Sequence, residues 1–189
     1  KYLNSPETKL FDKGKSLYNV NTARSALNKQ SSLIVAEGYM DVIALAQANF
    51  KASVAPLGTA ITKDQLALIW RISPNPVIAL DGDRAGINAA YRLIDVALPL
   101  IETGKTIKFV LMPEGYDPDD LIQERGRDAM QNLVDDAISL GDLLWKRETE
   151  GLSFNNPEAR AALDKKLDQA ISNVRDRQLK YHYQQYFKD

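Results

Sequence analysis

The stretch Ser32–Asp41, which reads S-L-I-V-A-E-G-Y-M-D, decides the fold. Its apolar run Leu33–Ala36 is short and continuous, which is typical of a strand buried on both faces of a parallel sheet. Glu37 ends this run, and Gly38 lets the chain turn sharply into a helix predicted over Met40–Asn49. Open α/β sheets bind their ligands outside the carboxyl ends of the strands. We therefore expect Glu37 to lie at a functional site.

Further strands and helices alternate downstream, which indicates a parallel sheet built from right-handed crossovers. The apolar runs predict three more strands, at Ala52–Pro56, Val77–Leu80 and Thr106–Met112. The apolar spacing predicts helices at Lys63–Ile72, with Thr62 as its N-cap, at Arg84–Glu102, which Pro99 should kink or end near Leu98, and at Asp120–Arg125.

The chain is expected to have three parts. Residues 1–30 are polar, with a short helix predicted at about Asn21–Asn28, and cannot bury a core by themselves. Residues 31–127 form the α/β domain. Residues 128–189 are predicted to be a helical subdomain without strands, and its segments are Ala129–Ile138, Leu140–Thr149, Pro157–Ile171 and Arg175–Phe187.

The composition excludes several classes of site. Of the 189 residues 44% are hydrophobic, which suffices for a core, and the net charge of −1 gives no global positive field for nucleic acid. The absence of cysteine excludes disulfides, zinc ribbons and thiol nucleophiles. No membrane span or signal peptide is recognisable, so we expect a cytoplasmic protein without membrane contacts. Because it begins at Lys1 without a methionine, we also expect an excised fragment.

Acidic residues follow three of the predicted strands. They are Glu37, Asp81 with Asp83, and Asp117 with Asp119. Since parallel strands end at the same edge of a sheet, these carboxylates should converge. Two carboxylates about 4 Å apart repel by about 4 kcal/mol at an effective dielectric near 20, so the cluster needs a cation. Oxygen ligands without histidine or cysteine suit Mg²⁺ or Mn²⁺, and such ions commonly serve phosphoryl transfer.

Structural interpretations compete with this one. Asp83 could simply cap the helix that follows it, and Asp117 could do the same with Pro118 at the first helical position. Asp-Gly at residues 81–82 is also a hairpin signal, although a helical pattern follows, and Glu37 alone could be an ion-pair partner. A metal site is favoured only because these acids are all expected at the same edge of the sheet. Trp70 and Trp145 lie at helical apolar spacing and are predicted to be core residues.

At this point the motifs resemble a known family. Glu37–Asp41 (E-G-Y-M-D), Asp81–Gly86 (D-G-D-R-A-G) and Asp117–Asp119 (D-P-D) are similar to the Toprim motifs of primases, topoisomerases and some nucleases. Lys1–Thr8 (K-Y-L-N-S-P-E-T), with Lys13-Gly14 behind it, resembles the segment that precedes the Toprim fold in DnaG-type bacterial DNA primases. The likeness covers residues 1–127 and implies a Toprim-like parallel sheet flanked by helices.

The resemblance also implies roles for individual residues. Glu37 would ligate metal and act as general base on the primer 3′-hydroxyl, and Asp81 and Asp83 would hold the catalytic Mg²⁺, for which Mn²⁺ can substitute. Asp117 and Asp119 would complete the site or bind a second ion. Lys1, Asn4 and Lys13 would face template or nucleotide phosphates, although Lys1 and Lys13 alone would be interpreted as solvated charges.

The implied activity is synthesis of RNA primers on single-stranded DNA from ribonucleoside triphosphates, with a replicative helicase contacted through a region not present here. We expect weak unaided priming, because the family's zinc-binding domain and most of its basic subdomain are missing. Two alternatives stay open. One is another Toprim enzyme, a nuclease or topoisomerase. The other is a receiver-like signalling module, which needs a lysine at the end of a late strand, where this chain has Pro113-Glu114-Gly115.

Overall fold

The computed structural model describes residues 12–29, 31–58, 60–153 and 156–188. The predicted nucleotide-binding residues Lys1 and Asn4 lie outside these residues. The strands are β1 (Leu17–Tyr18), β2 (Ile34–Val35), β3 (Ser53–Pro56), β4 (Val77–Leu80), β5 (Lys108–Leu111) and β6 (Ile138–Ser139). The helices are the 3₁₀ helix η1 (Lys13–Lys15) and the α-helices α1 (Val20–Ala26), α2 (Tyr39–Gln47), α3 (Lys63–Ile72), α4 (Arg84–Ala97), α5 (Pro118–Asp135), α6 (Leu140–Thr149), α7 (Pro157–Ser172) and α8 (Arg177–Tyr186).

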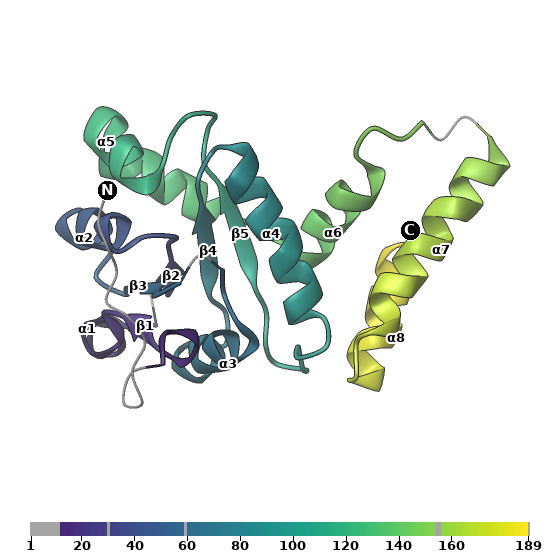
Figure 1. Ribbon diagram of the computed structural model, residues 1–189, viewed down its shortest axis with the longest axis horizontal. Coiled ribbons are helices and arrows are strands. Elements are labelled where there is room, and N and C mark those ends of the chain that lie inside the picture. Colours follow the sequence, from purple (N-terminus) through teal and green to yellow (C-terminus); the bar gives the residue numbers. More distant parts are fainter. Residues whose placement is uncertain (1–11, 30, 59, 154–155, 189) are drawn as a thin grey trace.

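The sheet has six strands in the order β1-β3-β2-β4-β5-β6 (Figure 1). The four central strands are parallel, and they are the four strands predicted from the apolar runs. Both edge strands are antiparallel to their neighbours, so the sheet is mixed rather than purely parallel. The predicted fold class, an α/β sheet flanked by helices with a helical C-terminal part, is confirmed.

The prediction that residues 128–189 contain no strand is wrong at one point. The helix expected to reach Ile138 ends at Asp135, and Ile138–Ser139 pairs with β5 as β6. Two residues are too few to show a strand period in sequence, and the pairing partner lies about thirty residues away.

The predicted break between two helices near residue 126 does occur. Gly126, inside α5, has φ 80° and ψ 175°, a conformation that favours glycine.

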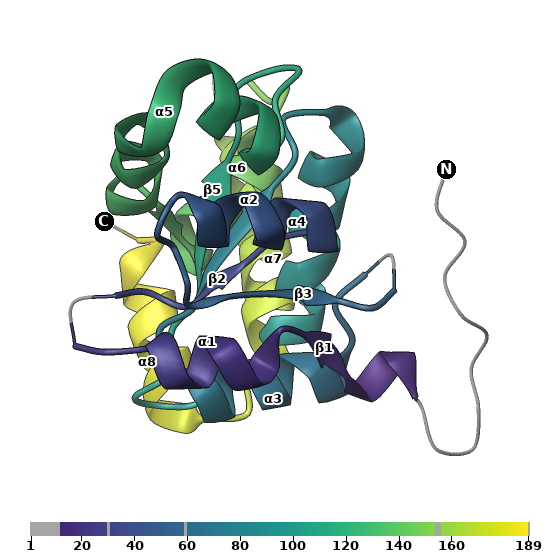
Figure 2. The same cartoon turned by 90° about the vertical axis from the view of Figure 1, so that its left-hand side faces the viewer.

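The sheet has one apolar cluster on each face. Along β2, Leu33 and Val35 belong to one cluster and Ile34 and Ala36 to the other, as alternation along a strand requires. Residues of α1, α3 and α4 join the first cluster, and residues of α2 and α5 join the second. Figure 2 shows α2 and α5 on one side of β2 and β3, with α1 and α3 on the other.

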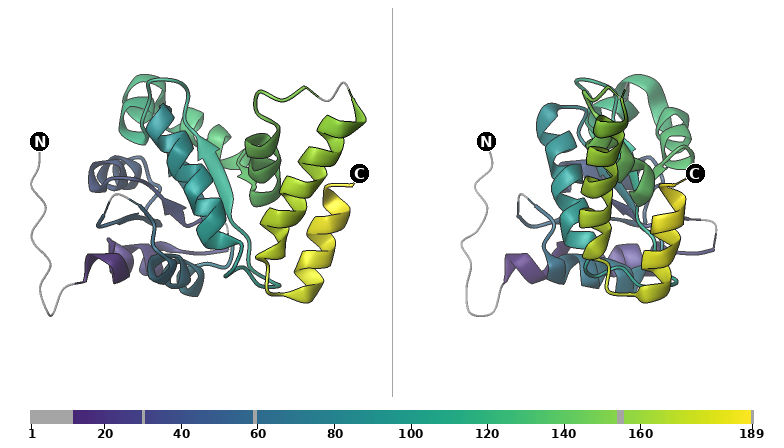
Figure 3. Two further views of the ribbon diagram at one scale, coloured as in Figure 1. Left: turned by 45° about the vertical axis from the view of Figure 1, so that its right-hand side comes forward. Right: turned by 90° about the vertical axis from the view of Figure 1, so that its right-hand side faces the viewer.

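The C-terminal helices share the core of the sheet. α7 and α8 lie side by side next to α6 (Figure 3), and buried side chains of α6 and α7 belong to the same cluster as β2 and α4. The proposed boundary at residue 127 therefore stays a prediction.

Trp70 is buried, as predicted, and its indole N–H donates to the Thr106 carbonyl at 2.8 Å. The prediction for Trp145 is wrong: it is 41% exposed, and its ring stacks on Phe187, the C-cap residue of α8, instead of lying in the core. None of the described helices is long and apolar enough to cross a bilayer.

The turns after β4 and β5 are joined by backbone hydrogen bonds. The Gly82 N–H donates to the Tyr116 carbonyl at 2.8 Å, and the Gly115 N–H donates to the Gly82 carbonyl at 3.0 Å. A Cβ atom on Gly82 would lie 1.8 Å from the Pro113 carbonyl oxygen. Only glycine allows this approach, which brings the residues after β4 next to those after β5.

The contact predicts a clear effect of Gly82→Ala. We expect the free energy of unfolding to fall by roughly 1–3 kcal/mol, because backbone atoms rather than a flexible side chain must move. Chemical denaturation measures this change. Gly58→Ala is the matched control, since nothing lies within 4 Å of a Cβ atom there. Equal stability of the two variants would contradict the proposed constraint.

Candidate metal and nucleotide site

Glu37 follows β2 and reaches across to the loop after β4. Its Oε1 accepts a hydrogen bond from the backbone N–H of Asp81 at 3.1 Å. The bond connects two neighbouring parallel strands at their carboxyl ends. It also sets the Glu37 carboxylate beside the Asp-Gly-Asp turn, where the sequence predicts it.

Asp81 is the most perturbed acid at this edge. Burial, and after it the charges of Glu37, Asp41, Asp117 and Asp83, together raise its pKa to about 7. Its Oδ1 is buried and has no hydrogen-bond partner in the part of the chain that the structure describes. A buried carboxylate oxygen that lacks a donor and lies in the field of other carboxylates is well suited to a cation.

Asp83 and Asp117 are helix caps, as the structural interpretation predicts. Asp83 Oδ1 accepts from the Gly86 N–H at the start of α4, and Asp117 Oδ1 accepts from the Asp120 N–H at the start of α5, both at 2.7 Å. A cap occupies one carboxylate oxygen, so the second oxygen of each aspartate remains for other interactions. Capping and metal binding are therefore compatible at both positions.

Asp41 is a member of the cluster that the sequence analysis did not select as a site residue. It lies in the first turn of α2, is 7% exposed, and accepts from the Gly38 N–H at 3.0 Å. Burial raises its pKa, the hydrogen bond from Gly38 lowers it, and the charges of Asp117, Asp119 and Glu37 raise it, which together bring the pKa to about 6. The available signal was its place three residues after Gly38, where an acid completes a capping box.

Asp119 and Lys13 complete the set of predicted residues. Asp119, in the first turn of α5, accepts from the Gln123 side-chain amide at 2.6 Å. Lys13 lies in η1 near the β1 edge of the sheet, and its carbonyl accepts from the Gln65 side-chain amide at 2.8 Å. Lys13 is partly exposed, so its ammonium group can reach solvent or a phosphate.

The acids after β2, β4 and β5 thus share one electrostatic field, and we call Glu37, Asp41, Asp81, Asp83, Asp117 and Asp119 the acid rim. In the present side-chain arrangement, no three potential ligands among the described residues converge closely enough to hold an ion. The fold gathers the charges, and their roles as ligands stay a prediction.

Comparison with known proteins supports the sequence resemblance. A Toprim-like family model matches residues 34–122. The DNA primase of Rickettsia conorii is 45% identical over 189 residues, and that of Escherichia coli K12 is 38% identical over 185 residues. These matches cover 100% and 98% of this chain and 32% of each relative.

Solved structures of DNA primases show the same similarity to this chain. A DnaG catalytic core superimposes with a TM-score of 0.91 at 38% identity, covering 98% of this chain and 60% of that chain. The chain thus carries a Toprim-like domain and is similar over nearly its whole length to the catalytic core of DnaG primases. A DNA primase domain from Pseudomonas aeruginosa gives a TM-score of 0.91 at 35% identity, with coverages of 98% and 58%. This chain spans about a third of the length of the DNA primases it matches. The likeness to Toprim domains and DNA primases implies dependence on a divalent metal, which the acid rim suits.

The raised pKa values predict a pH-dependent stability without divalent ions. Over roughly pH 4–7 the folded chain keeps protons on Asp81 and Asp41 that the unfolded chain releases, so the free energy of unfolding falls as pH rises. Asp81→Asn removes one charge, and we expect it to stabilise the protein at about pH 8 by on the order of 1 kcal/mol, after discounting for solvent screening. The gain should vanish near pH 4.

Thermal melts in a chelating buffer at both pH values measure the effect. Asp168→Asn, on the exposed side of α7, is the matched control and should melt as wild type at either pH. A loss of stability in Asp81→Asn at the higher pH would show that the rim carries no net repulsion.

Proposed function

We propose that this chain is the catalytic segment of a DNA primase, which synthesises short RNA primers on single-stranded DNA by metal-dependent nucleotidyl transfer. The single observation that carries the proposal is the buried Oδ1 of Asp81 within the acid rim, for which the described residues provide no hydrogen-bond partner. The relatives support it, since one matched structure is a DnaG primase catalytic domain bound to single-stranded DNA, with a TM-score of 0.90 at 37% identity.

In this proposal Asp81 and Asp83 hold a Mg²⁺ ion, with Glu37 as a further ligand. Asp117 and Asp119 complete the site or hold a second ion. When bound, Mg²⁺ would neutralise the charge that develops on the nucleotide phosphates. The hydrogen bond from Asp81 to Glu37 holds Glu37 Oε1, so the other carboxylate oxygen is the one available as general base toward the primer 3′-hydroxyl.

The partners follow from the same chemistry. A template strand and ribonucleoside triphosphates bring phosphates to the rim, and Lys13 would receive phosphates on the β1 side of the sheet. Lys1 and Asn4, outside the described residues, are proposed to bind phosphates as well. Association with a replicative helicase belongs to the whole protein and is proposed from the likeness to DNA primases alone.

Metal binding is tested with Mn²⁺, followed by electron paramagnetic resonance of the free ion. We expect Glu37→Gln and Asp81→Asn each to lower Mn²⁺ affinity by at least about tenfold, because each removes a charged ligand without changing its shape. Circular dichroism should show an unchanged fold. Asp168→Asn should bind as wild type. Unaltered affinity in both rim variants would place the ion elsewhere.

Activity is tested by template-directed dinucleotide synthesis with Mg²⁺. We expect weak synthesis by the isolated chain that requires both template and ion, and a further loss of at least roughly a hundredfold in Glu37→Gln and Asp81→Asn. Nicking of supercoiled plasmid without synthesis would favour a nuclease or topoisomerase instead. Labelling by a small phosphodonor would favour a receiver-like module.

A further inference from the structure

A cleft of about 710 Å³ adjoins the acid rim on the side of α4 and α6. Asp81, Gly82 and Asp83 form its end at the rim. Two helices supply most of its other polar lining residues: Arg84, Asn88 and Tyr91 from α4, and Lys146 and Glu150 from α6 and its C-terminal cap. Glu114 comes from the loop after β5. The cleft thus extends from the acid rim toward the C-terminal helices. The metal-binding roles proposed above do not involve its helical residues.

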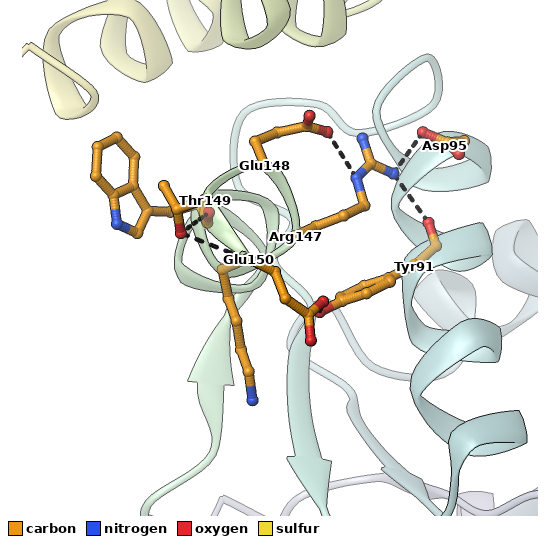
Figure 4. A network of polar contacts seen from close by, with 8 residues as sticks. Tyr91, Asp95, Arg147, Glu148, Thr149 and Glu150 are labelled. Carbon is orange, nitrogen blue, oxygen red and sulfur yellow. Dashed lines mark hydrogen bonds and ion pairs between the residues drawn. The ribbon is translucent and has the colours of Figure 1, made fainter. Parts of the chain in front are cut away.

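Hydrogen bonds between the two helices fix the walls of the cleft (Figure 4). The Arg147 guanidinium donates to Asp95 Oδ1 at 2.8 Å and to the Tyr91 carbonyl at 3.1 Å. The Tyr91 hydroxyl donates to Glu150 Oε2 at 2.9 Å. α4 and α6 are therefore tied together by side chains more than fifty residues apart, and the Tyr91 ring is held at the cleft.

Two cations in the cleft have no ion-pair partner in the described part of the chain. Arg84 and Lys146 are exposed, and no ion pair among the described residues includes either of them. Glu150, by contrast, is engaged by the Tyr91 hydroxyl. Guanidinium and ammonium groups beside an aromatic ring and the amide of Asn88 are the groups that bind a phosphate together with a base or sugar.

The acids of the cleft set a condition on such a ligand. Asp81, Asp83 and Glu114 also line the cleft and repel phosphate. A phosphate can therefore enter readily only when a divalent ion neutralises the rim. Lys13 lies near the β1 edge, whereas the cleft is beside β5 on the other side of β4, so a strand that crosses the rim from Lys13 arrives at the cleft.

We propose that the α4–α6 cleft is a second nucleotide subsite, which binds a phosphate-bearing unit beyond the acid rim through Arg84 and Lys146. Asn88 and Tyr91 lie beside its sugar or base. The inference rests on the proposed function and extends it to the path that nucleic acid takes across the sheet. The unit belongs either to a polynucleotide strand or to a free ribonucleoside triphosphate.

Fluorescence anisotropy in Mg²⁺ tests the proposal, with a labelled single-stranded oligonucleotide as one probe and a labelled ATP as the other. We expect Arg84→Gln and Lys146→Gln each to weaken binding roughly three- to tenfold, with the slope of log affinity against log salt smaller by about 0.7 for the strand. Lys165→Gln, on the exposed side of α7, is the matched control and should leave binding unchanged. An effect on the oligonucleotide alone assigns the cleft to a strand, and an effect on ATP alone assigns it to the free nucleotide.

Two failures are distinguishable. If both variants bind both probes as wild type does, while Mn²⁺ still binds through Glu37, the cleft assignment is overturned and the proposed function stands. If wild type binds neither probe and Mn²⁺ binding does not depend on Glu37, the proposed function and the subsite fall together. Both exposed side chains can be replaced without disturbing the core, and melting curves verify this.

Discussion

Repulsion between carboxylates at the ends of three parallel strands is the constraint on which this structure depends. The fold brings the charges together in two ways: the backbone N–H of Asp81 donates to the Glu37 carboxylate, and the backbone of Gly82 lies against the turn after β5. The raised pKa values of Asp81 and Asp41 show that bringing these buried charges together costs free energy. The apolar clusters on the two faces of the sheet offset it, and a hard cation would remove it.

The starts of three helices lower part of this electrostatic free-energy cost. Helices α2, α4 and α5 all begin at the acid rim, directly after β2, β4 and the loop that follows β5. Their N-termini carry partial positive charge and free N–H groups, and an acid in the first turn gains about 0.3–1 kcal/mol there. Asp41, Asp83 and Asp117 each accept one of these N–H groups. The helix starts therefore hold the acids of the rim in place, while Asp83 and Asp117 each keep a second carboxylate oxygen for other interactions.

Local patterns were sufficient to predict most of this. The four buried strands follow from their apolar runs, and Thr62, Asp83 and Asp117 cap helices as their sequence positions indicate. Features that depend on distant partners were missed. The strands β1 and β6 have two residues each and exist only through pairing with β3 and β5.

Contacts over long sequence separations explain the other omissions. The burial of Asp41 depends on the helices around it, and the spacing of apolar residues within α2 does not indicate it. Arg147 reaches Asp95 across 52 residues, and no pattern in either helix indicates that pair. The helical part consequently looks like an appendage in sequence, whereas β6 and the α4–α6 contacts attach it to the sheet. This attachment fixes α6 beside the rim, and it is the reason that Lys146 lines the same cleft as Asp81 and Asp83 although it lies more than sixty residues from them in the chain.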